Sequence, residues 1–83
     1  MYYTYVIYSK NFDKFYIGFT GDLEKRIQAH NHPKSKDYTR KFQPWIIVFS
    51  KLFEKKQDAM AYEKYLKSLK SKKALNELIK KQK

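Results

Sequence analysis

Aromatic and β-branched residues fill two short segments near the start of the chain. Residues Tyr2 to Ser9 and Phe15 to Thr20 are rich in Tyr, Val, Ile and Thr, the residue types that strands favour. The residues between them, 10–14, are mostly polar. The pattern therefore predicts a hairpin of two antiparallel strands.

The next apolar positions predict a helix and a third strand. Asp22 can cap a helix that carries Leu23 and Ile27 on its apolar side and ends near residues 31–33, where Pro interrupts it. Residues 34–43 are polar and basic and are predicted to form a loop. After Pro44, residues 45–53 begin with apolar residues on both faces, which predicts the central strand of a small sheet, covered on both sides.

Two further apolar stripes predict the last helices. Ala59, Tyr62, Leu66 and Leu69 recur at helical spacing, and Leu75, Leu78 and Ile79 mark a short helix after residue 71. The expected architecture is an α+β fold: a small three-stranded antiparallel sheet flanked by helices, in the order β-β-α-β-α-α. Eighty-three residues have too little apolar surface for two cores, so residues 1–83 are expected to form one domain.

The charge of the chain indicates the class of its partner. There are 19 Lys and Arg against eight Asp and Glu, a net charge of +11. This excess makes a polyanion the expected partner, DNA above all, with RNA left open. From Lys51 onward there are eleven Lys and four acids. A solubilising lysine face is the alternative. Five cations are the candidates for contacts to nucleic-acid phosphates: Arg40, Lys41, Lys70, Lys72 and Lys73.

Composition also excludes several chemistries. The chain has no cysteine, which removes disulfides, thiolate zinc sites and thiol nucleophiles. Its two glycines cannot build a Gly-rich phosphate loop, and its two histidines lack a zinc-binding pattern. The N-terminal apolar segment is too short to be a signal peptide or a membrane span, so a cytoplasmic protein is expected. Oligomeric state is not indicated by any pattern.

Glu63 does not fit a purely structural role. On the predicted helix it falls between the directions of Ala59 and Leu66, beside the stripe that faces the core. A buried carboxylate is costly unless a cation or hydrogen-bond donors meet it, so this position suggests a ligand. Alternatively, Glu63 lies at the edge of the stripe and pairs with Lys67, four residues on.

Four other side chains raise a similar question. Arg26 and His30 are four residues apart and project side by side, which suggests an anion site, although such a pair is more often a solvated helix face. Tyr5 and Tyr16 lie on the two hairpin strands, with Gly18 two residues after Tyr16, where a glycine leaves room for a close approach. The two tyrosines could instead be cross-strand core residues.

Taken together, these residues resemble the signature of the GIY-YIG endonucleases. The resemblance rests on the spacing of several elements along nearly the whole chain: Tyr3-Thr4-Tyr5, Tyr16-Ile17-Gly18, Asp22 to Arg26, His30-Asn31, Tyr38 to Lys41, Pro44-Trp45 and the Glu63 helix. The chain is similar to the small stand-alone bacterial members, which are related to the nuclease domain at the N-terminus of the bacterial excision-repair endonuclease. It departs from the family pattern at Tyr3 and Thr4, and Asn76 lies near the position of a family asparagine.

The resemblance implies a role for each unusual residue. It implies that Tyr5, Tyr16, Arg26, His30 and Glu63 gather on one concave face and hydrolyse a phosphodiester bond of DNA. Glu63 would bind one Mg²⁺ or Mn²⁺ ion. Tyr5 would be the general base, with a pKa lowered by neighbouring positive charge. Arg26 would stabilise the transition state, and Tyr16 and His30 would position water or phosphate. The rival hypothesis is a nucleic-acid-binding module that does not cut.

Overall fold

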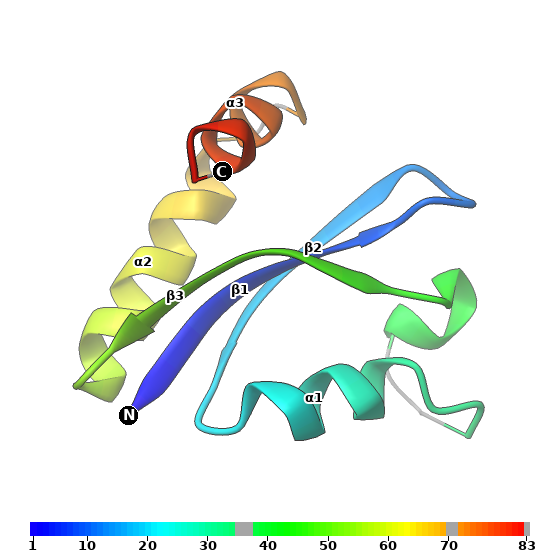
Figure 1. Cartoon of the computed structure of the whole chain (residues 1–83), viewed down its shortest axis with the longest axis horizontal. Coiled ribbons are helices and arrows are strands. Elements are labelled where there is room, and N and C mark those ends of the chain that lie inside the picture. The colour runs from blue at the N-terminus through cyan, green and yellow to red at the C-terminus, as the bar shows by residue number, and fades with distance from the viewer. Residues whose placement is uncertain (35–37, 70–71, 83) are drawn as a thin grey trace.

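The computed structural model describes residues 1–34, 38–69 and 72–82, and confirms the predicted order of strands and helices (Figure 1). The one addition is a 3-10 helix inside the segment predicted to be a loop. The elements are β1 (Tyr2–Ser9), β2 (Lys14–Thr20), α1 (Leu23–His30), η1 (Tyr38–Phe42), β3 (Ile46–Phe53), α2 (Lys56–Ser68) and α3 (Lys72–Gln82).

The three strands form one antiparallel sheet in the order β2-β1-β3. The prediction that β3 is the central strand is therefore wrong: β3 is an edge, and Ile46 and Ile47 are 54% and 41% exposed. Two features explain why residues 45–53 resemble a central strand in sequence. Trp45 precedes the strand and packs beside it, and a register shift between Val6 and Ile7 of β1 breaks the alternation of β3.

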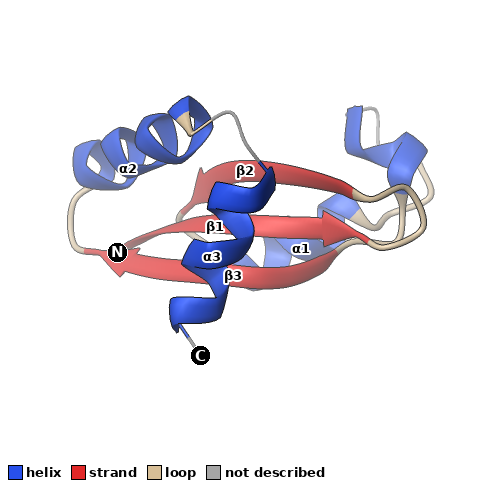
Figure 2. Ribbon diagram, turned by 90° about the horizontal axis from the view of Figure 1, so that it is seen from above, coloured by secondary structure: helices blue, strands red, loops and turns tan. Residues whose placement is uncertain are grey.

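Helices cover both faces of the sheet. α1 lies on one side and α2 and α3 lie on the other (Figure 1). Seen from above, α3 crosses the strands, whereas α2 lies toward the β2 edge (Figure 2). Successive side chains of β1 point to opposite faces of the sheet, so β1 contributes to the core on both faces. Val6 packs with Phe49 and Leu66 on the α2 side, while Tyr5 and Ile7 pack with Trp45.

Polar contacts fix the two ends of α1 and the chain that follows. The Asp22 carboxylate accepts a hydrogen bond from the Lys25 amide at 3.1 Å, which caps the helix as predicted. Beyond the helix, the Asn31 side chain bonds both backbone groups of Trp45, at 3.0 Å and 2.6 Å. The Gln43 side chain donates to the His30 carbonyl at 2.8 Å. These bonds hold the segment containing η1 against the end of α1.

Candidate active site

Tyr5 is the centre of the candidate site. It lies on the central strand, is 2% exposed, and has its ring on the α1 side of the sheet. Its partner on β2 is Gly18. A Cβ atom at Gly18 would stand 2.6 Å from the Tyr5 hydroxyl oxygen. The space that a glycine was predicted to leave on β2 is therefore filled by the hydroxyl end of the Tyr5 ring.

His30, at the end of α1, is fully buried and bonds through both ring nitrogens. Nε2 lies 2.9 Å from the Tyr5 hydroxyl, and Nδ1 lies 2.8 Å from the hydroxyl of Thr39. Thr39 belongs to η1 and is also fully buried. Sequence reasoning did not assign Thr39 a role, because a threonine in a polar, basic segment gives no sign that tertiary contacts bury it.

Tyr16 and Arg26 complete the surroundings of the Tyr5 hydroxyl. The Tyr16 ring lies 5.0 Å from the His30 ring, centroid to centroid, and the Tyr5 ring lies 5.9 Å from it. The Arg26 guanidinium hydrogen-bonds to the Tyr5 hydroxyl. Arg26 and His30 thus project from α1 to the same group, as their spacing predicted, so the pair is not merely a solvated helix face.

Glu63 approaches from α2. Its carboxylate is near enough to Tyr5 to raise the pKa of the phenol. It also forms an ion pair with Lys67 of the same helix at 3.7 Å, with the Glu63 side chain 21% exposed and that of Lys67 56% exposed. Glu63 therefore has the i, i+4 partner that one interpretation predicted, while its charge also acts on the Tyr5 phenol.

The pKa of Tyr5 departs from its ordinary value in the direction opposite to that predicted. Burial raises the pKa of the phenol, and the hydrogen bond and positive charge of Arg26 offset this only in part. The charges of Tyr16 and Glu63 raise it further. The prediction of a lowered pKa was wrong because it counted the neighbouring charge but not the depth of Tyr5 in the core. A raised pKa keeps the Tyr5 phenol protonated at neutral pH.

The cations predicted to contact phosphates fall into two groups. Arg40 and Lys41 are exposed on η1, next to Thr39 and so on the site's side of the sheet. Lys72 and Lys73 are exposed on α3, across the sheet from α1 (Figure 1). Lys72 is also paired with Asp13 of the hairpin turn at 2.9 Å. Lys70 lies outside the described residues.

A metal ion would find one protein carboxylate at this site. Among the residues that the structure describes, no three His, Asp or Glu side chains gather where they could hold a metal together. Glu63 is partly exposed and only loosely paired, so its oxygens can reach an ion. This donor set fits Mg²⁺, which keeps several waters and is commonly held by one or two carboxylates and a substrate phosphate.

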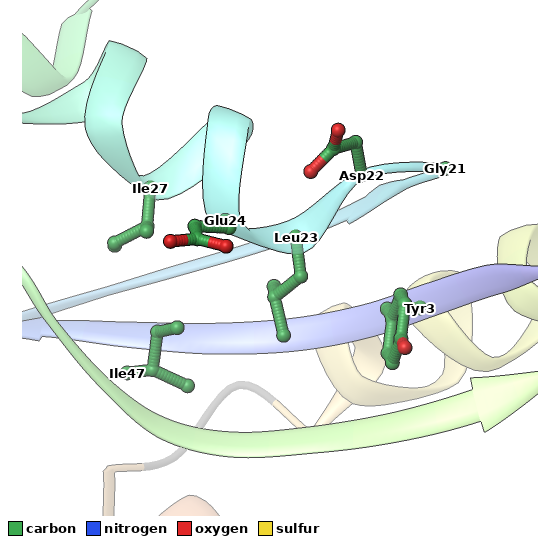
Figure 3. A pocket seen from close by; sticks show the side chains of 7 residues that line it. All are labelled: Tyr3, Gly21, Asp22, Leu23, Glu24, Ile27 and Ile47. Carbon is green, nitrogen blue, oxygen red and sulfur yellow. The ribbon is translucent and has the colours of Figure 1, made fainter.

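A hollow of about 460 Å³ opens elsewhere, between the strands and the start of α1 (Figure 3). Leu23 points from the helix toward the strands, opposite Tyr3 and Ile47. Asp22 and Glu24 are also among the residues that line it. Apolar side chains beside two negative charges disfavour a phosphate, so this hollow is not the site for a nucleic-acid backbone.

The close contact at Gly18 gives a test of the site's packing. We expect Gly18→Ala to destabilise the fold by about 1–3 kcal/mol, because the added Cβ overlaps a buried ring that His30 and Arg26 hold in place. The control is Gly21→Ala, where the nearest atom would be 3.6 Å away. Chemical denaturation of both variants checks this. Equal stability of Gly18→Ala and Gly21→Ala would contradict the described position of Tyr5.

No helix among the described residues has the length and apolar character that crossing a membrane requires.

Comparison with known proteins agrees with this geometry. The GIY-YIG catalytic domain family matches residues 1–76. The UPF0213 protein CPE1444 of Clostridium perfringens is 41% identical over 69 residues, which cover 83% of this chain and 73% of that protein. The UPF0213 protein YazA of Bacillus subtilis is 39% identical over 69 residues, covering 83% of this chain and 69% of that protein.

A solved structure gives the same result for the fold. The solution NMR structure of the UPF0213 protein BH0048 from Bacillus halodurans superposes with a TM-score of 0.59 at 32% identity. The match covers 96% of this chain and 84% of that one. The family match spans most of the chain, and the motif tyrosines, Arg26 and His30 lie together around the buried Tyr5 hydroxyl. The chain belongs to the GIY-YIG catalytic domain family.

Proposed function

We propose that this protein is a metal-dependent endonuclease that hydrolyses phosphodiester bonds in DNA. One observation carries the proposal: the buried Tyr5 hydroxyl on β1 meets His30 and Arg26 of α1, with Tyr16 of β2 packed beside the His30 ring. A purely structural core has no need to bring an arginine to a buried phenol and histidine pair. A phosphodiesterase needs a base, a cation for the developing charge and a metal ligand.

Glu63 would hold the metal ion, Mg²⁺ or Mn²⁺, through one carboxylate, and waters and a phosphate oxygen of the substrate would complete its shell. When bound, the ion would neutralise charge on the phosphate and on the leaving oxygen. The partial exposure of Glu63 leaves its oxygens accessible. Lys67 would have to give up or share its ion pair when the metal binds.

The remaining residues would act on the nucleophile and the phosphate. Tyr5 would take a proton from the attacking water as the general base. Because its phenol is neutral in the free protein, its own proton must leave as it acts, and His30 is the hydrogen-bonded neighbour. Arg26 would stabilise the charge that builds on the phosphate oxygens in the transition state. Tyr16, close to the His30 ring, would help to orient the water or the phosphate.

A second candidate function is a nucleic-acid-binding module of the same fold that does not cut. The Glu63–Lys67 ion pair favours it, because a structural partner for the carboxylate removes part of the need for a metal. The hydrogen bond between Arg26 and the buried Tyr5 hydroxyl favours the enzyme, since simple phosphate binding would leave the guanidinium pointing to solvent.

The experiment that tests the proposed function is incubation with labelled duplex, branched and single-stranded DNA and with RNA, each with Mg²⁺, Mn²⁺ or EDTA. We expect cleavage of at least one DNA substrate with metal and none in EDTA. Binding without cleavage across the whole panel would instead support the non-cutting module. Comparison of the substrates would also identify the preferred nucleic-acid structure, which phosphate contacts alone do not determine.

The two groups of cations make different predictions for binding. We expect Arg40→Gln with Lys41→Gln to lower the steepness of log affinity against log salt by about 0.9 for each phosphate contact removed. Lys72→Gln with Lys73→Gln should have a smaller effect, because α3 lies across the sheet from the site and Lys72 pairs with Asp13. Fluorescence titrations at several salt concentrations measure both slopes. A larger decrease of this slope in the Lys72→Gln, Lys73→Gln variant would identify the C-terminal lysines as the main contact surface for phosphates.

A further inference from the structure

Three buried groups form a chain of hydrogen bonds that ends at Thr39. Thr39 and His30 are fully buried, and Tyr5 is 2% exposed. The hydroxyl of Thr39 lies 2.8 Å from Nδ1 of His30, and Nε2 of His30 lies 2.9 Å from the hydroxyl of Tyr5. A neutral imidazole has one N–H donor and one bare nitrogen, so the chain has a direction. Either Tyr5 donates to His30 and His30 donates to Thr39, or every bond is reversed.

The difference in acidity between the Tyr5 and Thr39 hydroxyl groups favours the first of these two directions. A phenol is a far stronger hydrogen-bond donor than an aliphatic hydroxyl, and a bare imidazole nitrogen is a stronger acceptor than a phenol oxygen. Donation from the Tyr5 hydroxyl to Nε2 therefore joins the stronger hydroxyl donor to the stronger acceptor. In the reverse direction the donor is the weaker Thr39 hydroxyl, and the phenol oxygen has to act as an acceptor. Arg26 adds to this preference, because a cation that donates to the Tyr5 oxygen polarises its O–H bond.

We propose that Thr39 is a positioning residue that holds the neutral His30 ring as its Nδ1–H tautomer, so that the bare Nε2 receives the Tyr5 proton. The tautomer of a histidine is set by the hydrogen bond that its other ring nitrogen makes. Here that partner is the Thr39 hydroxyl, which accepts from Nδ1–H. Removal of the hydroxyl takes this acceptor away from Nδ1–H, which favours the opposite tautomer.

The surroundings of Thr39 keep its hydroxyl in place. The Thr39 carbonyl accepts a hydrogen bond from the Trp45 indole N–H at 2.7 Å. Trp45 is itself bonded through its backbone to the Asn31 side chain, directly after His30. The η1 segment is thus tied to the end of α1 at a buried indole, which places the hydroxyl beside the ring. This gives the segment a role beyond linking α1 to β3.

The catalytic consequence rests on the proposed function. As the Tyr5 O–H bond breaks and the Nε2–H bond of His30 forms, the phenolate oxygen takes a proton from the attacking water. The water oxygen bonds to phosphorus while the bond from phosphorus to the leaving sugar oxygen breaks, and the leaving oxygen takes a proton from solvent. Tyr5 ends neutral and the proton ends on His30, so the charge balances. In the reversed direction, Nε2 already carries a proton and could accept none. Thr39 acts only through His30 and does not touch the substrate.

The test uses the whole chain, labelled with ¹⁵N at histidine, because ¹⁵N chemical shifts distinguish the two neutral tautomers. The exposed His32 is an internal reference, since its Nδ1 accepts a hydrogen bond from the Lys34 amide at 3.0 Å. His32→Gln assigns the two signals. We compare wild type with Thr39→Ser, which keeps the hydroxyl, and Thr39→Val, which keeps the shape but removes it. Spectra are recorded at a pH where His30 is neutral.

We expect the Nδ1–H form of His30 in wild type and in Thr39→Ser, and the Nε2–H form in Thr39→Val. Cleavage by Thr39→Val should have a kcat about 10- to 100-fold lower at unchanged KM, with Thr39→Ser near wild type. An Nε2–H wild type, or an unchanged tautomer in Thr39→Val, would overturn the proposal. If Thr39→Val does not fold, Thr39→Ala removes the same hydroxyl and takes its place in the comparison. Failure of wild type to cut any substrate would refute the proposed function instead, because the spectra need no activity.

Discussion

Tyr5→Phe is expected to lower the rate of DNA cleavage by about 100-fold or more while the protein still folds. The substitution keeps the buried ring but removes the hydroxyl that would act on the attacking water, and general-base help is usually worth about that factor. It also removes the buried hydrogen bond between the Tyr5 hydroxyl and Nε2 of His30, so the stability of the fold should fall by about 1–3 kcal/mol. Single-turnover cleavage and chemical denaturation measure the two effects separately.

Tyr8→Phe is the matched control for this prediction. Tyr8 lies on the same strand and its hydroxyl also bonds a side chain, Asp13 at 2.8 Å, but this bond is exposed and away from the site. Its removal should leave cleavage unchanged. If Tyr5→Phe cuts as fast as wild type, Tyr5 is a core residue only. The general base would then be sought at Tyr16 or His30.

Glu63→Gln is expected to abolish metal-dependent cleavage with little change in stability in EDTA. The amide is nearly isosteric but neutral, so it would no longer hold a hard cation. Its loss of the partly exposed Lys67 ion pair should cost at most about 0.5 kcal/mol, and removal of a partly buried charge offsets some of that. Wild type should gain stability from the metal, by about 1.4 kcal/mol at ten times the Kd, and Glu63→Gln should not.

Lys67→Gln separates the two roles of Glu63. It breaks the same ion pair but keeps the carboxylate, so it should match Glu63→Gln in EDTA and resemble wild type in metal-dependent stabilisation and cleavage. Thermal melts of the three proteins with EDTA, Mg²⁺ or Mn²⁺ provide the comparison. Full activity in Glu63→Gln would rule out Glu63 as the metal ligand and favour the non-cutting module.

The order of the elements could be predicted from the sequence, because hydrophobic period and capping are local signals. Asp22 caps α1 as its position indicated, and Leu66 and Ala59 are buried on α2 as their spacing required. The position of β3 in the sheet could not be predicted in the same way. Its apolar run includes Trp45, which lies outside the strand, and a break in alternation that only the pairing with β1 reveals.

The residues of the candidate site could likewise be predicted only in part. Tyr5, Arg26 and His30 were selected through the resemblance to the family signature, because helix and hairpin spacing alone allowed a purely structural interpretation of each. The structure places the three side chains beside one another. Thr39 was missed because its burial depends on contacts across a loop, among them the bond from Trp45. The direction of the Tyr5 pKa shift was missed for a related reason: depth of burial is a property of the whole fold, whereas a neighbouring charge can be inferred from spacing.

The most direct test of the central claim is a single-turnover cleavage measurement, with wild-type protein in excess over a labelled DNA substrate and Mn²⁺ or Mg²⁺ varied from zero. We expect that product forms only with metal, that the rate saturates as one site fills, and that EDTA stops it. The same titration with Glu63→Gln should stay flat. Product formed equally in EDTA, or tight DNA binding with no product at any metal concentration, would contradict the assignment of a metal-dependent nuclease.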